Sequence, residues 1–348
     1  MAITGENPEL FESRKADHIR LALEERMQAT GGSGLHSIEL IHEAFPEIDF
    51  NEVQIEQRLF SDSPISPLFI SSMTAGHAGS VDLNLTMARV CEKRNWAMGV
   101  GSQRRQLTDS TADLEWSKIR KACPKVKFFG NIGVAQLIRT KVEDIRRLVD
   151  TLDATAMIVH TNPLQECMQP EGTPHFRGGL EALENLAKTL GRPVIVKETG
   201  CGFSGATLKR LNGIGVGAVD VSGFGGTHWG RIEGGRSKPG AKLNAVAETF
   251  RDWGIGTVES LEAALAVRSD YEVWASGGVR SGLDAAKLLA MGAKMVGLAK
   301  PIIEAALGGE EALDLRMGQL ELELKIALFC TGSRNIAELQ EKRVWRRQ

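Results

Sequence analysis

The amino-acid sequence predicts an α/β protein, a (β/α)₈ barrel of the TIM type with an N-terminal extension. Eight short apolar runs alternate with stretches of helical periodicity from residue 66 onward. The runs are continuously hydrophobic, as expected for parallel strands that are covered on both faces. Glycine and polar residues follow the runs directly, as they do at the carboxyl ends of barrel strands. A doubly wound open sheet is the alternative, and the count of eight strands favours the barrel.

The strands and helices of the barrel follow in chain order. The expected strands are residues 68–72, 97–100, 126–130, 156–160, 193–198, 218–222, 272–276 and 295–298. Helical stretches between them include residues 82–94, 142–152, 180–190 and 283–291. The length of 348 residues is ordinary for such a barrel with extensions.

Residues 1–65 lack this strand–helix rhythm and are expected to form an N-terminal arm, with the barrel and C-terminal helices over residues 66–348. A charged helix is expected over residues 13–30, where the glycines of residues 31–34 end it. Residues 53–56 alternate in polarity and predict a short strand. Pro64 and Pro67 mark the entry to the barrel.

Charge and cysteine content narrow the class of protein. The 42 basic and 44 acidic residues give a net charge of −2, so neither nucleic acid nor a membrane surface is expected as a partner. The five cysteines are scattered without a CxxC pair, which favours a reduced, cytoplasmic setting. No apolar run approaches the roughly 18 residues of a membrane span.

The last two expected strands end in a pattern typical of a phosphate site. Gly277-Gly278 follows one strand, and Gly297-Leu298-Ala299-Lys300 ends the next. Glycine-rich strand ends that lead into helices present backbone N–H groups to an anion. Barrels often hold a phosphate after strands 7 and 8. A phosphorylated ligand is therefore expected here.

Lys197 lies inside an otherwise apolar strand, where a lysine is costly without a compensating partner. One interpretation is a cation that stands beside an electron-rich cofactor. The alternative is a structural ion pair with Glu198 or another carboxylate. The position of Lys197 near a strand end favours the first interpretation.

The loop after the fourth strand carries His160, Asn162, Gln165 and Glu166. Carboxylate and amide oxygens are ligands that suit Mg²⁺. A diphosphate bound nearby would strengthen the interpretation of Glu166 as a metal ligand, because its charge must be neutralised. The alternative for Glu166 is a solvated loop carboxylate. His160 is either a general acid or base or a hydrogen-bonded core histidine.

Further anion contacts are expected from two other segments. Ser102-Gln103-Arg104 offers a hydroxyl, an amide and a guanidinium to phosphate oxygens. Arg14 and Lys15, with His18 one helical turn later, form a small basic face, although an ordinary exposed helix is the alternative. The glycine-rich run 222–227 is another candidate anion cradle, and the long loop 223–240 is a candidate lid.

Several motifs together resemble the type 2, FMN-dependent isopentenyl-diphosphate delta-isomerases. These are RKADHI, MTAG, GVGSQR, NIG, HTNPLQE with QPEG, KETG and SGFGGTHWGRIEGGR, followed by the phosphate segment SGGVRSGLDAAKLLAMGA and GLAK. The resemblance covers residues 13–301. Ala75 departs from the family's usual MTGG, and Thr173-Pro174-His175 replaces an acidic residue after QPEG.

The resemblance implies an isomerase that interconverts isopentenyl and dimethylallyl diphosphate with reduced FMN, Mg²⁺ and NADPH as reductant. It implies a homo-oligomer, a tetramer or octamer, in which the arm contributes to the substrate site. The implied FMN contacts are Ser72, Met73, Thr74, Ser102, Asn131, Lys197, Ser222, Thr227, Gly278, Val279, Arg280, Ala299 and Lys300. The implied substrate contacts are Arg14, Lys15, Ser102, Gln103, Arg104 and Gln165, with Glu166 on the metal. Catalytic roles fall to Gln165, Lys197 and His160.

Two other functions share parts of these motifs. FMN-dependent α-hydroxy-acid oxidases and dehydrogenases resemble the chain at SGGVR, but they carry a catalytic histidine and a substrate arginine after strand 6. Phe224 and Thr227 stand at those places here. A non-catalytic flavin-binding barrel would need no second anion site, so the GSQR loop and Arg14-Lys15 argue against it.

Overall fold

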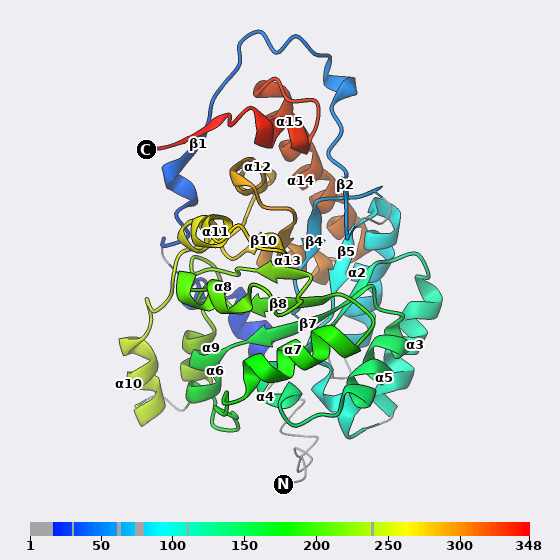
Figure 1. The fold of residues 1–348 in the computed structure, drawn as a ribbon, viewed down its shortest axis with the longest axis vertical. Coiled ribbons are helices and arrows are strands. Elements are labelled where there is room, and N and C mark those ends of the chain that lie inside the picture. Colours follow the sequence, from blue (N-terminus) through cyan, green and yellow to red (C-terminus); the bar gives the residue numbers. More distant parts are fainter. Residues whose placement is uncertain (1–16, 30, 61–63, 74–79, 110, 238–239) are drawn as a thin grey trace.

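Eight parallel strands close into a barrel in the computed structural model, which describes residues 17–348 apart from 30, 61–63, 74–79, 110 and 238–239 (Figure 1). The strands follow one another around the barrel in chain order, and the last pairs with the first. They are β4 (Leu68–Ile70), β5 (Ala97–Gly99), β6 (Phe128–Gly133), β7 (Ala156–Thr161), β8 (Val194–Glu198), β9 (Ala218–Asp220), β10 (Glu272–Ser276) and β11 (Val296–Leu298). The predicted barrel and its eight strands are confirmed.

Helices surround the barrel and continue beyond its last strand (Figure 1). The barrel helices and their extensions are α2 (Ser80–Arg94), α3 (Thr111–Ala122), α4 (Val134–Leu137), α5 (Val142–Leu152), α6 (Pro163–Met168), α7 (Gly179–Thr189), α8 (Gly205–Leu211), α9 (Trp229–Arg236), α10 (Lys242–Thr249), α11 (Thr257–Ala266), α12 (Gly282–Met291) and α13 (Lys300–Leu307). The C-terminal helices are α14 (Glu310–Cys330) and α15 (Ile336–Glu341). The four predicted helices are confirmed as α2, α5, α7 and α12. None of the described helices is both long and apolar enough to cross a membrane.

Strand alternation divides the core into an inner and an outer layer. Trp274 fills the barrel interior, with its ring centroid 5.3 Å from that of Phe69 and 5.4 Å from that of Phe129. Ile195 belongs to this inner layer, whereas Val196 packs in the outer layer with the helices. Because successive side chains of a strand point to opposite faces, Lys197 points inward and Glu198 outward.

The N-terminal arm differs from the sequence prediction in two places. Residues 17–23 are helical, and a 3₁₀ turn, η1 (Glu25–Met27), replaces the rest of the expected helix. The expected strand over residues 53–56 is wrong. The strand there is β2 (Gln57–Arg58), since the antiparallel partner β3 (Pro64–Ile65) fixes its register.

The remaining arm elements connect the two ends of the described chain. Strand β1 (Ile38–Leu40) pairs with β12 (Trp345–Arg347), so the arm lies beside the C-terminus (Figure 1). Three short 3₁₀ turns complete the described elements: η2 (Leu35–Ser37), η3 (Phe50–Glu52) and η4 (Gln103–Leu107).

The segment 223–240 is not the long structureless loop that the sequence suggested. Helix α9 forms within it, and His228 at its N-cap accepts a hydrogen bond from the backbone N–H of Arg231. Its buried face carries Ile232 and Glu233. Residues 229–236 of this segment therefore form a packed helix, and Trp229 at its start lines the barrel mouth.

Candidate functional site

Two adjoining pockets open at the carboxyl ends of the barrel strands. The glycine-lined pocket, of about 110 Å³, lies among the loops that follow β8 to β11. The polar pocket, of about 120 Å³, lies among the loops that follow β5, β6 and β7. Residues that line both are His18, Ser72, Met73, Lys197, Thr199 and Trp229. The pockets are therefore two parts of one cavity.

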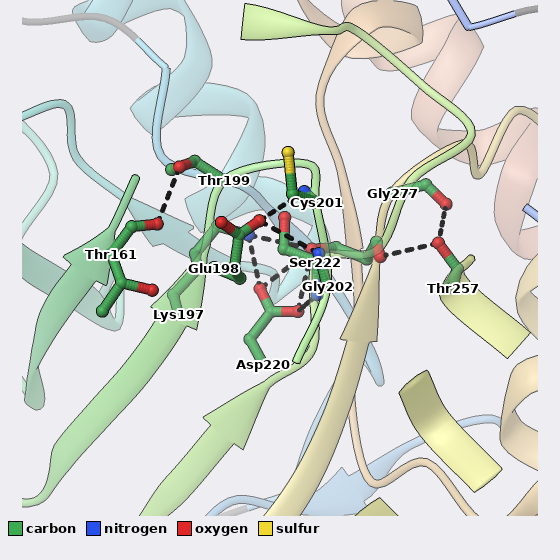
Figure 2. Close-up of polar contacts among 11 residues, drawn as sticks. Thr161, Lys197, Glu198, Thr199, Cys201, Gly202, Asp220, Ser222, Thr257 and Gly277 are labelled. Atoms are coloured by element: carbon green, nitrogen blue, oxygen red, sulfur yellow. Dashed lines mark hydrogen bonds and ion pairs between the residues drawn. The ribbon is translucent and has the colours of Figure 1, made fainter. Parts of the chain in front are cut away.

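Lys197 stands where the two pockets meet. Its ammonium donates to Asp220 Oδ2 over 2.7 Å and to Ser276 Oγ over 2.9 Å, while Ser276 Oγ lies 2.8 Å from Asp220 Oδ1 (Figure 2). These residues come from the adjacent strands β8, β9 and β10. The alternative of an ion pair is thus confirmed, with Asp220 rather than Glu198 as partner. Lys197 nevertheless lines the cavity, so the pair does not remove it from the site.

Backbone geometry prepares the glycine-lined pocket for an anion. Gly278 has φ +73°, and a Cβ there would lie 2.6 Å from the carbonyl oxygen of Gly225. In the described part of the chain, the N–H groups of Gly278 and Val279 donate to no acceptor. Free N–H groups at such a turn form an anion-binding nest.

Two cations complete this anion site. Burial lowers the pKa of Arg280, although Glu304, Glu25 and Asp284 lie near enough to oppose the shift. Its guanidinium donates to Gln28 Oε1 over 2.7 Å, and the ammonium of Lys300 lies 2.5 Å from Glu25 Oε1. A phosphate beside Arg280 would favour its charged form, so the residues fit the phosphate of a bound cofactor.

Two serine hydroxyls support the same conclusion. Ser71 Oγ and Ser72 Oγ are buried and have no hydrogen-bond partner among the described residues. Both serines line the glycine-lined pocket, directly after β4. Buried hydroxyls are almost always hydrogen-bonded, so two unpaired hydroxyls in residues of the cavity wall call for a partner that the described chain does not supply.

The polar pocket contains a chain of hydrogen-bonded amides. His160 Nδ1 lies 2.9 Å from Asn131 Oδ1. Asn162 donates to Gln165 Oε1 over 3.0 Å and to Glu166 Oε1 over 3.2 Å. These contacts fix the directions in which the side chains present their remaining donors and acceptors to the cavity.

Glu233 anchors this pocket and was missed by the sequence analysis. The buried carboxylate accepts from Gln165 over 2.8 Å and from Arg236 over 2.6 Å, and lies 2.9 Å from His18 Nε2. Burial alone would raise its pKa, but hydrogen bonds from His18, Gln165 and Arg236 bring the pKa of Glu233 down to about 2. Glu233 falls within the motif SGFGGTHWGRIEGGR, but the sequence assigned it no role, because its partners His18 and Gln165 lie on distant parts of the chain.

Glu198 forms a wall of the site from outside the barrel. Its Oε2 accepts the backbone N–H groups of Cys201 and Gly202, the latter over 3.1 Å, and so closes the turn 198–202 (Figure 2). Burial raises the pKa of Glu198 to about 8 despite these bonds. Thr199 and Gly200 of the same turn line the cavity. The carboxyl therefore shapes the site without entering it.

The structure brings most of the predicted site residues together. Those that line the cavity are Ser72, Met73, Ser102, Arg104, Asn131, His160, Gln165, Glu166, Lys197, Ser222, Thr227, Gly278, Val279, Arg280, Ala299 and Lys300. Arg14, Lys15 and Thr74 lie outside the described residues.

Gln103 is the exception among the described residues, because it lies behind the cavity wall. Its Oε1 accepts the backbone N–H of Asn131 over 2.9 Å, and its amide donates to Gln106 and to the carbonyl of Leu148. With its side chain buried and satisfied, Gln103 supports the polar pocket and does not face it.

A metal at this site would depend on ligands from outside the protein. Within the described ranges, no three His, Cys, Asp or Glu side chains come close enough to hold an ion. Glu166 is buried, and its carboxylate receives the N–H of Thr173 as well as Asn162. One carboxylate fits Mg²⁺ only if water or phosphate oxygens complete the shell.

The residues that would serve an α-hydroxy-acid oxidase are not at the cavity. Phe224 is buried and packs edge-on to His228, with ring centroids 5.7 Å apart. His228 caps α9, and burial lowers its pKa. Neither side chain lines the two pockets, so the geometry provides no histidine base after β9.

Comparison with known proteins identifies relatives over almost the full chain. The family model described as FMN-dependent dehydrogenase matches residues 111–346. A protein of Bdellovibrio bacteriovorus named isopentenyl-diphosphate delta-isomerase is 56% identical over 96% of this chain and 97% of its own. A protein of the same name from Legionella pneumophila is 52% identical over 95% of this chain and 97% of its own. Another, from Halobacterium salinarum, is 40% identical over 97% of this chain and 94% of its own.

Solved structures share the barrel. A lactate oxidase of Pediococcus acidilactici aligns with a TM-score of 0.67 over 98% of this chain and 94% of its own, at 18% identity. A mandelate oxidase with an FMN adduct aligns with a TM-score of 0.64 over 95% and 94%, at 17% identity. At such low identity these matches establish the fold alone.

We predict that Asp220→Asn lowers the free energy of unfolding by about 3–5 kcal/mol, because it leaves the Lys197 ammonium buried without a counter-charge. Chemical denaturation measures the change. Glu184→Gln is the matched control: its pair with Lys188 (2.6 Å) is exposed and contributes less than about 1 kcal/mol. Equal effects of the two variants would contradict the structural role of the buried pair.

The pKa of Glu198 predicts a pH-dependent stability. The pKa of the Glu198 carboxyl is about 8 in the folded chain, against an ordinary value of 4.5, so between these pH values the folded state holds a proton that the unfolded state has lost. The free energy of unfolding should therefore fall as pH rises through this window, by at most about 1.4 kcal/mol per unit. Chemical denaturation of the wild-type protein and of Glu198→Gln at each pH compares their free energies of unfolding. A stability difference between the two proteins that does not change from pH 5 to 8 would refute the shift.

Proposed function

The chain belongs to the isopentenyl-diphosphate delta-isomerase family, and from this premise we propose that it interconverts isopentenyl and dimethylallyl diphosphate. We propose further that it does so with reduced FMN and Mg²⁺, and that NADPH serves as reductant. The observation that carries the proposal is the position of Lys197, between two pockets that each suit an anion. A phosphorylated cofactor and a diphosphate substrate need two such places.

The glycine-lined pocket would hold FMN. Its phosphate would lie against the N–H groups of Gly278 and Val279 and the cations of Arg280 and Lys300. The unpaired hydroxyls of Ser71 and Ser72 would meet polar atoms of the ring system. Reduced FMN supplies acid–base chemistry at its ring nitrogens.

The polar pocket would hold the diphosphate. Arg104 lines it and forms no ion pair with a described residue, so its guanidinium is free to bind phosphate. Glu166 would hold Mg²⁺, whose remaining ligands would come from the diphosphate and water. Arg14 and Lys15 of the arm would add positive charge, in a homo-oligomer of four or eight chains.

Moving an allylic double bond requires that one carbon gains a proton and another loses one. The cavity side chains suited to position this exchange are Lys197, Gln165 and His160. Lys197 would favour negative charge on the adjacent ring edge, because its ammonium is buried and fixed by Asp220 and Ser276. The amide of Gln165, held between Glu233 and Asn162, would orient the hydrocarbon end of the substrate.

The proposal predicts proton exchange with solvent that depends on reduced flavin. In D₂O, dimethylallyl diphosphate should gain deuterium only when the bound FMN is reduced. Lys197→Ala should lower kcat at least about 100-fold through lost electrostatic stabilisation, with circular dichroism and flavin absorbance reporting fold and loading. Lys188→Ala, at an exposed lysine, is the control. Deuterium uptake with oxidised flavin, or full turnover by Lys197→Ala, would overturn the mechanism.

A separate prediction concerns the metal. Glu166→Gln should raise the Mg²⁺ concentration for half-maximal activity about 10-fold or more, because a neutral amide is a weaker ligand than a carboxylate. The measurement is the initial rate against Mg²⁺ after removal of metal with EDTA. Glu171→Gln is a matched control, since Glu171 pairs with Arg236 and does not line either pocket. Unchanged Mg²⁺ dependence of Glu166→Gln would exclude Glu166 as the ligand.

A further inference from the structure

A large groove lies outside the barrel, between α7 and α8. Its volume is about 770 Å³, within the range of roughly 300–1,000 Å³ that is typical of small-molecule sites. The groove is mainly apolar: its hydrophobic lining includes Phe176, Leu180, Leu183, Phe203, Leu211 and Ile255. Helix α8 spans only seven residues, Gly205–Leu211, and packs against α11. The groove is lined by residues of this short helix and of α7.

Glu198 lies in the wall of this groove and points into it from β8. The side chain is 4% exposed, and only backbone N–H groups bond to it: no side chain in the described part of the chain donates to its carboxyl. Its pKa of about 8 keeps it a neutral acid below that pH, because burial disfavours the charge. A protonated carboxyl whose Oε2 accepts from Cys201 and Gly202 has an O–H to donate into the groove.

Two opposite charges, Arg210 on α8 and Glu181 on α7, stand among the residues that line the groove. Arg210 is exposed and bonds to Thr207. The Cys201 thiol lies in the same wall, where burial and then Glu198 raise its pKa. Among the described residues, the one cation that lowers the pKa of Glu198 is Lys197, and its ammonium is bound to Asp220 inside the barrel and does not face the groove. An anionic head group would therefore be disfavoured there.

We propose that this groove is a second ligand site, for an uncharged and mainly apolar molecule that carries a hydroxyl or carbonyl oxygen, with the Glu198 O–H as its hydrogen-bond donor. The apolar body would cover the exposed side chains between α7 and α8. The oxygen would satisfy the carboxyl that the protein itself leaves without a side-chain partner. This site does not depend on the isomerase activity.

The groove shares a wall with the catalytic cavity. Glu198, Cys201 and Gly202 line the groove, whereas Thr199 and Gly200 line the glycine-lined pocket. The N–H groups of Gly200 and Gly202 both donate to the carbonyl of Ser222, over 3.0 and 3.2 Å. A ligand bound to Glu198 would favour one conformation of the turn 198–202. Binding in the groove should therefore change the affinity of the cavity for its own ligand, and a ligand in the cavity must change the affinity of the groove by the same factor.

The test is a titration of the flavin-loaded protein with 1-decanol, followed by calorimetry and by the fluorescence of Trp253, which lines the groove and is 60% exposed. Decanoate is the anionic comparison and n-decane lacks the oxygen. We expect decanol to bind about 10-fold more tightly than either at pH 6.5. Equal binding of decanol and decanoate, or no binding of decanol, would overturn the proposal.

Variants separate this site from other places where an alcohol could bind. Leu180→Trp fills the groove and should weaken decanol binding at least 10-fold, whereas Leu283→Trp on α12 should not. Glu198→Val should remove the preference for decanol over decane. If decanol still binds to Leu180→Trp but no longer binds to Lys197→Ala, decanol occupies the catalytic cavity and not the groove. A changed oligomeric state of Leu180→Trp in light scattering would instead identify the groove as an interface between copies. Either result would refute the proposal.

The conservative variant provides the sharpest readout. Glu198→Gln keeps an N–H donor for the ligand and an oxygen for the turn, so it should bind decanol at every pH. The wild-type protein should lose affinity between pH 7 and 9.5 as the Glu198 carboxyl ionises at about 8. The same decline in both proteins would show that Glu198 is not the donor.

Discussion

The buried ammonium of Lys197 is the constraint on which the mouth of this barrel depends. An isolated charge inside a protein is strongly disfavoured, and Asp220 and Ser276 compensate it from the two following strands. The pair therefore joins the ends of β8, β9 and β10. It also holds a cation where the two pockets meet, so one arrangement stabilises the fold and prepares the site for negative charge.

Alternation along β8 places two ionisable groups in opposite environments. Lys197 points into the barrel and is paired, whereas its neighbour Glu198 points outward, forms no ion pair with a described residue and has its pKa raised to about 8 by burial. The carboxyl closes the turn that borders both the catalytic cavity and the outer groove. Two consecutive residues thus serve different sites, because a strand in a closed barrel has one face in each layer.

Glu233 shows how a helix over the barrel mouth adds what strand ends cannot supply. The carboxylate accepts from Gln165 on α6 and lies against His18 of the arm, so it fixes three segments that are far apart in sequence. Its pKa of about 2 keeps it charged across the physiological range. A permanent anion buried behind Gln165 orients the amide more firmly than a neutral partner would.

The barrel, its eight strands and most of the cavity lining could be predicted from the amino-acid sequence. Continuous apolar runs require burial on both faces, and side chains that directly follow parallel strands must meet at one end. The pairing of polar groups, by contrast, depends on how the chain folds. Asp220 and Glu233 carry no local signal of their partners, and Gln103 follows a strand as Ser102 does but turns behind the wall to bond Asn131. Pairing depends on side-chain direction and on contacts between segments distant in the chain, and neither periodicity nor motif spacing encodes these.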